Sequence, residues 1–352
     1  MRIRIELCRS AASLLTICTM LAMLPAAWGA TLVVANKSDA TVSLLNLASG
    51  EVGATLPTGE GPHEVGISPN GRFALVTNYG GRGRNNNSLT LVDIAAASVV
   101  KTIDLGEYKA PHGVEWIDDK RAAVTVEANQ ALAVVDVDKG EVIQAIATDQ
   151  DISHMVALDP DGQRAYTSNM GSGTISVLDL GAGERLKNIA TGKGAEGIAV
   201  SAAGQVWVTN RDDDTLTVLD AGSFATLKEI SSVGFPIRAT ATPKGQVLVT
   251  RARAGDLVIY DAESFEEVRT VPFDLKSLGS DGRLFRDRFG DSSVPIGVVV
   301  DDAGERAFVA HANADVITEV DLDSGEVVRL LRAGREPDGM GYSATAPKSS
   351  PQ

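Results

Sequence analysis

The chain has 352 residues, 44% of them apolar, and a formal net charge of −14 at pH 7. This length and composition are ordinary for a folded protein with one large all-β domain or two smaller domains. The negative charge argues against a general affinity of the surface for nucleic acid or for an anionic membrane, although it leaves room for local basic patches. After residue 30 no segment is long and apolar enough to span a bilayer.

The first 29 residues have the pattern of a secretory signal peptide. Three arginines precede an apolar run over 11–24, and Ala27 and Gly29 place small residues where a signal peptidase cleaves. We therefore expect residues 1–29 to be removed and the mature protein to be periplasmic. The alternative is an uncleaved membrane anchor, but the apolar run falls short of the ~20 residues that a spanning helix needs. Both cysteines, Cys8 and Cys18, lie in this segment, so we expect no disulfide and no thiolate metal site in the mature chain.

A repeated phrase organises the rest of the chain. Its first copy, GPHEVGISPNGRFALVTN, covers 61–78, and five further copies follow. Each copy precedes a second pair of apolar runs, such as GTISVLDLGAGERLKNI at 173–189. Four short runs rich in β-branched residues, separated by turns that contain Gly, Asp or Pro, predict a four-stranded antiparallel meander. Equivalent positions are spaced 49, 42, 42, 41, 59 and 42 residues apart, and a period near 42 is typical of a β-propeller blade.

The two ends of the chain predict the seventh blade. Residues 32–56 contain three strand-like runs without a first strand, and 336–343 contain a first strand with nothing after it. Together they complete a blade and close the ring, which removes exposed sheet edges. An open solenoid or a sandwich would not need complementary half-blades. We therefore predict a single all-β domain over 30–343, a seven-bladed β-propeller of four-stranded antiparallel blades closed by strands from both termini, followed by a disordered tail over 344–352.

The strand phrases resemble a known family. PNGRFALVTN, VWVTN and LVVAN, followed by TVSLL or TISVLD, resemble the YVTN-repeat family of bacterial β-propellers, which is related to surface-layer-type repeats and to lactonase-like propellers. The resemblance covers essentially the whole mature chain. It implies the architecture but not one activity, because members of the family include binding proteins and enzymes.

An asparagine ends the second strand of four blades, and we expect it to cap the following turn. It is present as Asn36, Asn78, Asn169 and Asn210, and is replaced by Val126, Arg251 and His311. The three blades without it must close this turn differently, and Arg251 and His311 are therefore candidates to face a ligand.

The position that begins each innermost strand predicts a functional ring. Because the innermost strands of a propeller line its central channel, these seven side chains should lie close together at one mouth. In blade order they are His63, His112, His154, Glu196, Ile237, Ile296 and Asp338. Imidazole and carboxylate groups suit a divalent ion such as zinc, copper, nickel or iron, so the candidate metal ligands are His63, His112, His154, Glu196 and Asp338. The alternatives are histidines that only support the channel or bind water, and direct contact with a ligand without metal.

Two insertions, at 80–87 and 275–293, fall on the predicted face of this ring and are rich in arginine. Loop extensions on a rigid scaffold often carry binding sites. We therefore expect an anionic or polar ligand over the channel mouth, with 275–293 as a partial lid. The candidate ligand-binding residues are Arg82, Arg84, Arg211, Arg251, Arg253, Arg286, Arg288 and His311. The alternative is that the acidic residues Asp281, Asp287 and Asp291 neutralise the arginines of the second insertion.

Familiar catalytic motifs are missing from the sequence. It has no Gly-x-Ser-x-Gly elbow, no phosphate-binding loop and no haem-attachment CxxCH. We therefore predict a periplasmic binding or scaffold propeller, monomeric, with no cofactor beyond a divalent ion, that presents one face to a small ligand, a metal ion or a partner protein. The alternative is a metal-assisted hydrolase or lyase, lactonase-like, in which Asp338 or Glu196 is catalytic. Nucleic acid is a weaker candidate because only 5% of the residues are aromatic.

Overall fold

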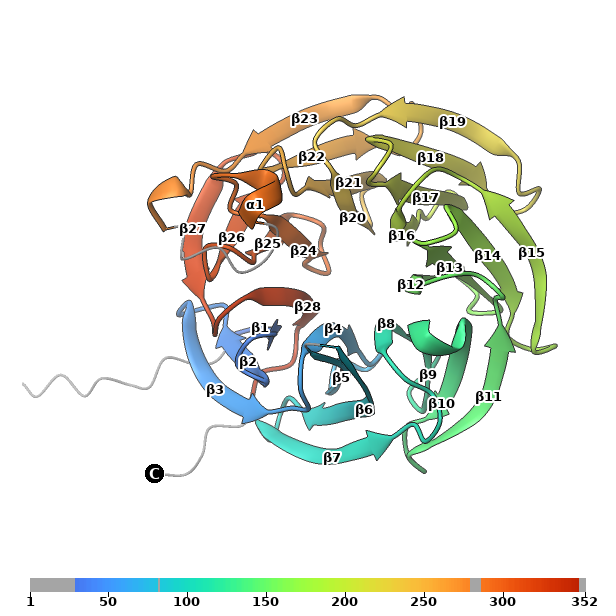
Figure 1. Ribbon diagram of the computed structural model, residues 1–352. Helices are drawn as coiled ribbons and strands as arrows, with labels where there is room; N and C mark the ends of the chain where they lie inside the picture. The colour runs from blue at the N-terminus through green and yellow to red at the C-terminus, as the bar shows by residue number, and fades with distance from the viewer. Residues whose placement is uncertain (1–28, 82, 279–285, 348–352) are drawn as a thin grey trace, which may run out of the picture.

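The computed structural model describes residues 29–81, 83–278 and 286–347. It contains seven four-stranded antiparallel sheets arranged as a ring around a central axis (Figure 1). The fold is a seven-bladed β-propeller, as the repeat predicts. Residues 1–28 of the predicted signal peptide lie outside the described residues, as do 348–352 of the predicted tail.

Each blade runs outward from an innermost strand. The first three blades are β4 (Pro62–Ile67), β5 (Phe73–Gly81), β6 (Arg84–Asp93) and β7 (Ser98–Asp104); β8 (Pro111–Trp116), β9 (Arg121–Val126), β10 (Ala131–Asp136) and β11 (Glu141–Ala147); and β12 (Ser153–Leu158), β13 (Arg164–Asn169), β14 (Thr174–Asp179) and β15 (Glu184–Ala190). The next three are β16 (Ala195–Val200), β17 (Gln205–Asn210), β18 (Thr215–Asp220) and β19 (Thr226–Ser231); β20 (Pro236–Ala241), β21 (Gln246–Arg251), β22 (Asp256–Asp261) and β23 (Glu267–Pro272); and β24 (Pro295–Val300), β25 (Arg306–His311), β26 (Val316–Asp321) and β27 (Val327–Arg332).

The seventh blade joins the two ends of the chain, as predicted. It consists of β28 (Pro337–Ser343), β1 (Thr31–Asn36), β2 (Thr41–Asn46) and β3 (Glu51–Pro57), in this order from the axis outward. Strand β28 pairs antiparallel with β1, and the register places Thr31 opposite Ser343. The Thr31 hydroxyl also donates a hydrogen bond to the Thr345 carbonyl oxygen at 2.7 Å, so the described start of the predicted tail is attached to β1.

The apolar core lies between neighbouring blades. The middle strands are buried on both faces, as in β1, whereas an outermost strand such as β7 alternates exposed and covered residues. One apolar cluster, for example, packs Leu75 and Leu89 of the first blade against Val114 and Val124 of the second. Burial of such side chains at about 25 cal/mol per Å² of apolar surface is the main force that holds the ring together.

Hydroxyl groups in the second strands connect several blades to the next. The Thr77 hydroxyl donates a hydrogen bond to the His112 carbonyl oxygen at 2.8 Å, and Thr125 does the same to His154 at 2.6 Å. Thr250 repeats the contact with Ile296 at 2.8 Å. The threonine of the repeated VTN phrase therefore fixes the backbone of the ring position in the following blade.

The asparagine that follows this threonine binds the third strand of its blade and the incoming crossover. Asn78 donates to Ser88 and Thr90 of the third strand at 3.0 and 3.1 Å, and its Oδ1 accepts the Gly59 amide at 3.0 Å. It therefore ties the incoming crossover to the blade, which is more than the turn capping that the sequence predicts. His311 takes over this role, with its two ring nitrogens 2.9 and 3.0 Å from the hydroxyls of Ser293 and Thr318. It is fully buried, so this geometry gives it no contact with a ligand.

The two insertions adopt different structures. The first is not an open loop, because β5 and β6 extend through it as a longer hairpin that pairs Gly80 with Asn85. The second contains the 3₁₀ turn η2 (Lys276–Leu278) and the short helix α1 (Arg286–Phe289). Another 3₁₀ turn, η1 (Glu127–Asn129), lies outside the insertions. It follows β9 in the blade where Val126 replaces the asparagine. Within the described residues, no helix has the length and apolar character needed to cross a membrane.

Candidate functional site

The seven ring positions come together at one end of the channel, around a cavity of about 100 Å³ that we call the histidine mouth. Each of them is the second residue of an innermost strand. Three basic residues that the ring prediction did not include also line the cavity. The lining residues are Lys37, His63, His112, His154, Glu196, Arg211, Ile237, Arg238, Ile296 and Asp338.

A β-bulge in each innermost strand explains this convergence. In the first blade Pro62 lies opposite Asn78, but the next pair is Val65 with Val76, so the innermost strand has one extra residue. A bulge redirects the side chains beside it. Two consecutive residues, His63 and Glu64, consequently both line the channel. Alternation of side chains along a regular strand would have placed them on opposite faces.

The strands approach one another closely at the mouth. A Cβ atom added to Gly339 would lie 2.2 Å from the His63 carbonyl oxygen, so only glycine fits there. Gly113 is constrained in the same way, with 2.8 Å to the His154 carbonyl oxygen. The close approach keeps the mouth narrow and brings side chains from different blades into contact.

Three histidine rings are packed in a row. The ring centroids of His63 and His112 lie 4.8 Å apart, and those of His112 and His154 lie 3.7 Å apart. Tyr79 covers the row, with its centroid 4.7 Å from that of His63. The Tyr79 hydroxyl donates a hydrogen bond to Glu127 Oε2 at 2.7 Å.

The hydrogen bonds leave several nitrogen atoms free. His63 Nδ1 lies 3.0 Å from the Gly61 carbonyl oxygen, and His154 Nδ1 lies 2.5 Å from Glu127 Oε1. Because each acceptor requires a proton on Nδ1, the free lone pair in the neutral rings is on Nε2. His154 Nε2, His112 Nδ1 and Asp338 Oδ1 are buried without a hydrogen-bond partner. Glu196 Oε1 is 3.5 Å from His154 Nε2, which is an ionic contact too long for a good hydrogen bond.

Arg238 closes the channel beneath the histidines. Its guanidinium donates to Glu196 Oε1 at 3.0 Å and to Glu64 Oε1 at 2.6 Å, and all three side chains are buried. Arg211 binds the second oxygen of Glu196, and Lys37 lies 3.3 Å from Asp338 Oδ2. Buried charges are tolerated when they are paired in this way, because an isolated charge would lose its hydration.

The surroundings of the three histidines shift their pKa values in different directions. Burial, together with the positive charge of Lys37, lowers the pKa of His63 to about 3. Burial and the neighbouring His154 also lower the pKa of His112 well below its usual value. For His154, burial opposes the charged form, but the hydrogen bond with Glu127 and the negative charges of Glu127 and Glu196 raise its pKa overall.

The carboxylates of the ring are held ionised. Burial alone would raise the pKa of Glu196, but His154 and two arginines lower it to about 2. The pKa of Asp338 is also lowered, because Lys37 and His63 outweigh the effect of burial.

Glu127, which the ring prediction missed, completes the site. Donor atoms of His112, Glu127 and His154 all lie within 4.8 Å of one another, a group that could hold a metal ion. Glu127 reaches the mouth because the turn η1 follows Val126. Val126 stands where four other blades have asparagine, and this difference in the sequence indicated that the following loop is altered.

The arginines predicted to bind a ligand are paired with carboxylates in the described part of the chain. Arg251 makes a bidentate pair with Asp256 at 2.8 and 2.7 Å, and Arg288 binds Asp212 at 3.0 Å. The closest N–O distances of the remaining pairs are 3.5 Å for Arg253–Asp214 and 3.5 Å for Arg84–Glu60. Arg82 and the side chain of Arg286 lie outside the described residues, as do Asp281 and the side chain of Asp287, so the predicted pairs with these acids are not described.

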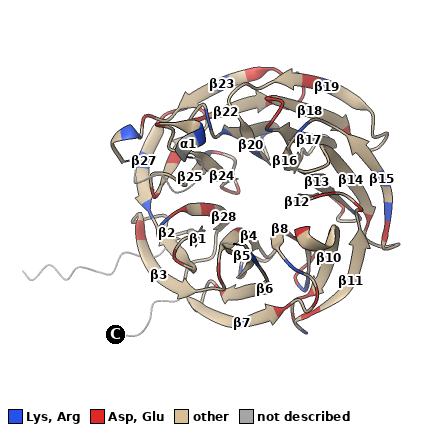
Figure 2. Ribbon diagram, in the orientation of Figure 1, with Lys and Arg blue, Asp and Glu red and all other residues tan. Residues whose placement is uncertain are grey.

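Three of these guanidinium groups surround Phe235. The guanidinium carbons of Arg211, Arg253 and Arg288 lie 5.2, 5.4 and 4.6 Å from its ring centroid. Through these contacts α1 packs against Phe235, which lies in the crossover before β20. Figure 2 shows basic and acidic residues interspersed around the ring rather than separated. Within the described residues, Arg211, Arg253 and Arg288 therefore stabilise the packing of α1, and whether these arginines also bind a ligand stays a prediction.

Comparisons with known proteins agree with the propeller fold. The family model described as YNCE-like beta-propeller matches residues 27–121, and the one described as Cytochrome D1 heme domain matches 118–273. Among solved structures, Kuenenia stuttgartiensis hydrazine synthase has 17% sequence identity and a TM-score of 0.65, covering 88% of this chain and 99% of that chain. Dihydro-heme d1 dehydrogenase NirN in complex with DHE has 16% identity and a TM-score of 0.63, covering 91% and 78%. No curated protein matches. At these identities the likeness shows the fold alone.

Proposed function

We propose that this protein is a binding propeller that holds a divalent transition-metal ion at the histidine mouth. The observation that carries the proposal is the set of buried nitrogen atoms without partners, His112 Nδ1 and His154 Nε2, beside the acidic Glu127. Buried polar atoms are normally satisfied, and a shared ion would satisfy both nitrogens together. Two histidines and a carboxylate form a common zinc ligand set.

The surrounding residues support the histidines as ligands. Metal-binding histidines usually donate their second nitrogen to a carboxylate or a backbone carbonyl. His63 has this arrangement, because its Nδ1 lies 3.0 Å from the Gly61 carbonyl oxygen. The donor atoms, up to 4.8 Å apart, would move closer on binding, because Zn–N bonds of about 2.0 Å place tetrahedral ligands about 3.3 Å apart.

A haem does not fit the histidine mouth in this geometry. Haem appears in the names of one matching family model and of NirN. However, organic cofactors occupy pockets of roughly 300–1,000 Å³, whereas this cavity measures about 100 Å³. The rings of His112 and His154, with centroids 3.7 Å apart, also leave no space for a macrocycle between them. We therefore assign no step to haem.

Binding is a better proposal than hydrolysis or lyase chemistry for this site. A general base is most effective when its pKa lies near the working pH. Glu196 has a pKa of about 2 and is engaged by two arginines, and the pKa of Asp338 is lowered as well. Neither candidate catalytic residue has the properties of a base at neutral pH.

We further propose that the protein acts in the periplasm and belongs with the YVTN-repeat propellers. The signal-like pattern of residues 1–29 supports export, and the repeated VTN phrase supports the family. A decorated propeller face in that compartment would present the ion, or the adjoining loops, to a small ligand or a partner protein.

Metal analysis tests the proposal. Mature protein purified from periplasm without a chelating tag is analysed by inductively coupled plasma mass spectrometry, before and after incubation with zinc or copper and then dialysis. We expect about one ion per chain in the native protein and less than a tenth of that in His112→Ala, because one of the two free nitrogens is lost.

His311→Asn is the matched control. It removes the one histidine outside the histidine mouth and restores the residue that four other blades carry, so it should retain the ion. Circular dichroism establishes that each variant is folded. No bound ion in folded native protein after both incubations, or equal loss in the two variants, would contradict the metal site.

A further inference from the structure

The opposite end of the channel contains a larger cavity, which we call the far vestibule. The innermost strands begin at the histidine mouth and end here, and Glu115 follows the ring residue His112 by three positions, which is about 10 Å along a strand. It has a volume of about 440 Å³ and continues into a second cavity of about 310 Å³ that ends at Glu64 and Arg238. The two cavities share four lining residues, Glu115, Ile198, Ala239 and Thr240.

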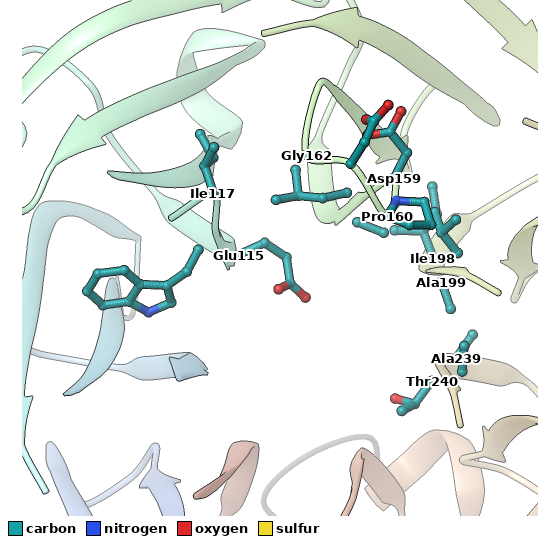
Figure 3. A pocket seen from close by; sticks show the side chains of 15 residues that line it. Glu115, Ile117, Asp159, Pro160, Gly162, Ile198, Ala199, Ala239 and Thr240 are labelled. Carbon is teal, nitrogen blue, oxygen red and sulfur yellow. The ribbon is translucent and has the colours of Figure 1, made fainter. Parts of the chain in front are cut away.

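Glu115 is the distinctive residue of the far vestibule. Figure 3 shows its carboxyl group pointing into the cavity from β8, toward Ile198 and Ala239 on the facing strands. The side chain of Glu115 is exposed to the interior of the channel, which the surrounding blades enclose. None of the described residues forms a hydrogen bond or an ion pair with it. The apolar side chains of Ile117 and Ala199 also line the cavity.

The charges around the vestibule favour a cation. Among the described residues that line the two cavities, Arg238 is the sole basic one, and Glu64 and Glu196 already bind it. Acidic residues from several elements also line the two cavities: Glu64 on β4, Asp159 and Asp161 in the turn after β12, and Asp302 after β24. A cation in the vestibule would therefore meet a negative potential inside low-dielectric walls, where the attraction is strong.

We propose that the far vestibule binds an organic ammonium ion, with Glu115 as the counter-ion and Ile117, Ile198 and Ala239 in contact with its apolar part. The volume falls in the range of roughly 300–1,000 Å³ that small-molecule sites occupy. The Glu115 carboxylate, which none of the described residues pairs with, suits one positive charge, and the side chains of Ile117, Ile198 and Ala239 suit a hydrocarbon body.

The protonation of Glu115 gives the site a pH signature. Burial and the nearby Glu64 raise the pKa of Glu115 to about 7. An alkylammonium keeps its charge to about pH 10, as lysine does. Its affinity should therefore increase from pH 6 to pH 8 as Glu115 loses its proton. Burial also raises the pKa of Glu64, although the adjacent Arg238 favours the charged form of Glu64.

The test is a titration of the mature protein with n-hexylammonium at pH 8, followed by calorimetry and by the fluorescence of Trp116, which lines the vestibule. Hexanoate and hexan-1-ol have the same apolar body without the positive charge. We expect hexylammonium to bind, hexanoate not to bind, and hexan-1-ol to bind at least tenfold more weakly.

Variants identify the residue responsible. Glu115→Gln keeps the shape of the side chain and should weaken hexylammonium binding at least tenfold and abolish the dependence on pH. Glu184→Gln, on the exposed outer strand β15, should bind as the native protein does. No binding of hexylammonium, equal binding of hexan-1-ol, or an unchanged affinity of Glu115→Gln would each overturn the proposal. The inference is independent of the metal site.

Discussion

The four histidines differ in what surrounds them. Three meet at the histidine mouth and form a row, whereas His311 lies apart from them, between Ser293 and Thr318 and against the ring of Phe273. All are buried, so a neutral ring costs little and a charged ring needs a partner. His154 has such a partner in Glu127, and its pKa is raised. His311 has only neutral hydroxyls, and burial lowers its pKa to about 3.

His311 should make the protein less stable in acid. The unfolded chain takes up a proton on this side chain below pH 6.5, but the folded state keeps it neutral down to about pH 3. The free energy of unfolding therefore falls as pH decreases between these values, by up to about 1.4 kcal/mol per pH unit for one group. Urea unfolding at pH 7.5, 6 and 5 should show a shallower decrease in His311→Asn than in the native protein. Parallel pH profiles would contradict the assignment.

Within each blade, the second strand connects neighbours and positions the ring. Thr125 of β9 accepts the Gly113 amide at 2.8 Å and donates to the His154 carbonyl oxygen at 2.6 Å, so one hydroxyl satisfies groups of two innermost strands. This explains why the repeated phrase pairs a hydroxyl residue with asparagine. The hydroxyl holds the next blade, and the asparagine holds the crossover.

Replacing the Thr125 hydroxyl should destabilise this connection. Thr125→Val keeps the shape but leaves a buried amide and a buried carbonyl without partners, which costs about 1–3 kcal/mol. Thr125→Ser keeps both hydrogen bonds, as Ser168 does in the third blade, and should lose less. Urea unfolding at pH 7.5 measures both. If the serine variant were the less stable of the two, packing of the methyl group would be the more important contribution.

At the scale of the whole molecule, the ring depends on one pairing between its ends. Strand β28 covers the edge of β1 and brings Asp338 beside Lys37 and His63. Without it, β1 would expose a row of unpaired backbone groups, and the first and sixth blades would lose a neighbour.

Deletion of 336–352 should therefore lower the thermal unfolding midpoint by more than about 10 °C and promote aggregation, since a loss above ~5 kcal/mol is a large share of the stability of a domain. A circular permutant that places 336–347 directly before residue 30 should restore the native midpoint, because Ser343 already lies opposite Thr31. Differential scanning calorimetry compares the three proteins. An unchanged midpoint after the deletion would show that closure is not required.

The sequence by itself determined the number of blades, the closure by both termini and the ring of seven positions, because these follow from a local period that repeats along the chain. Only the tertiary structure decided what the ring positions contact. Arg238 meets Glu64 across 174 residues of sequence, and Glu127 meets His154 through an altered turn in the preceding blade. In some blades the bulge added a second residue to the channel lining, as with Glu64, Met155 and Arg238. Such contacts depend on how the closed ring brings side chains to its axis, and a repeat period carries no information about that.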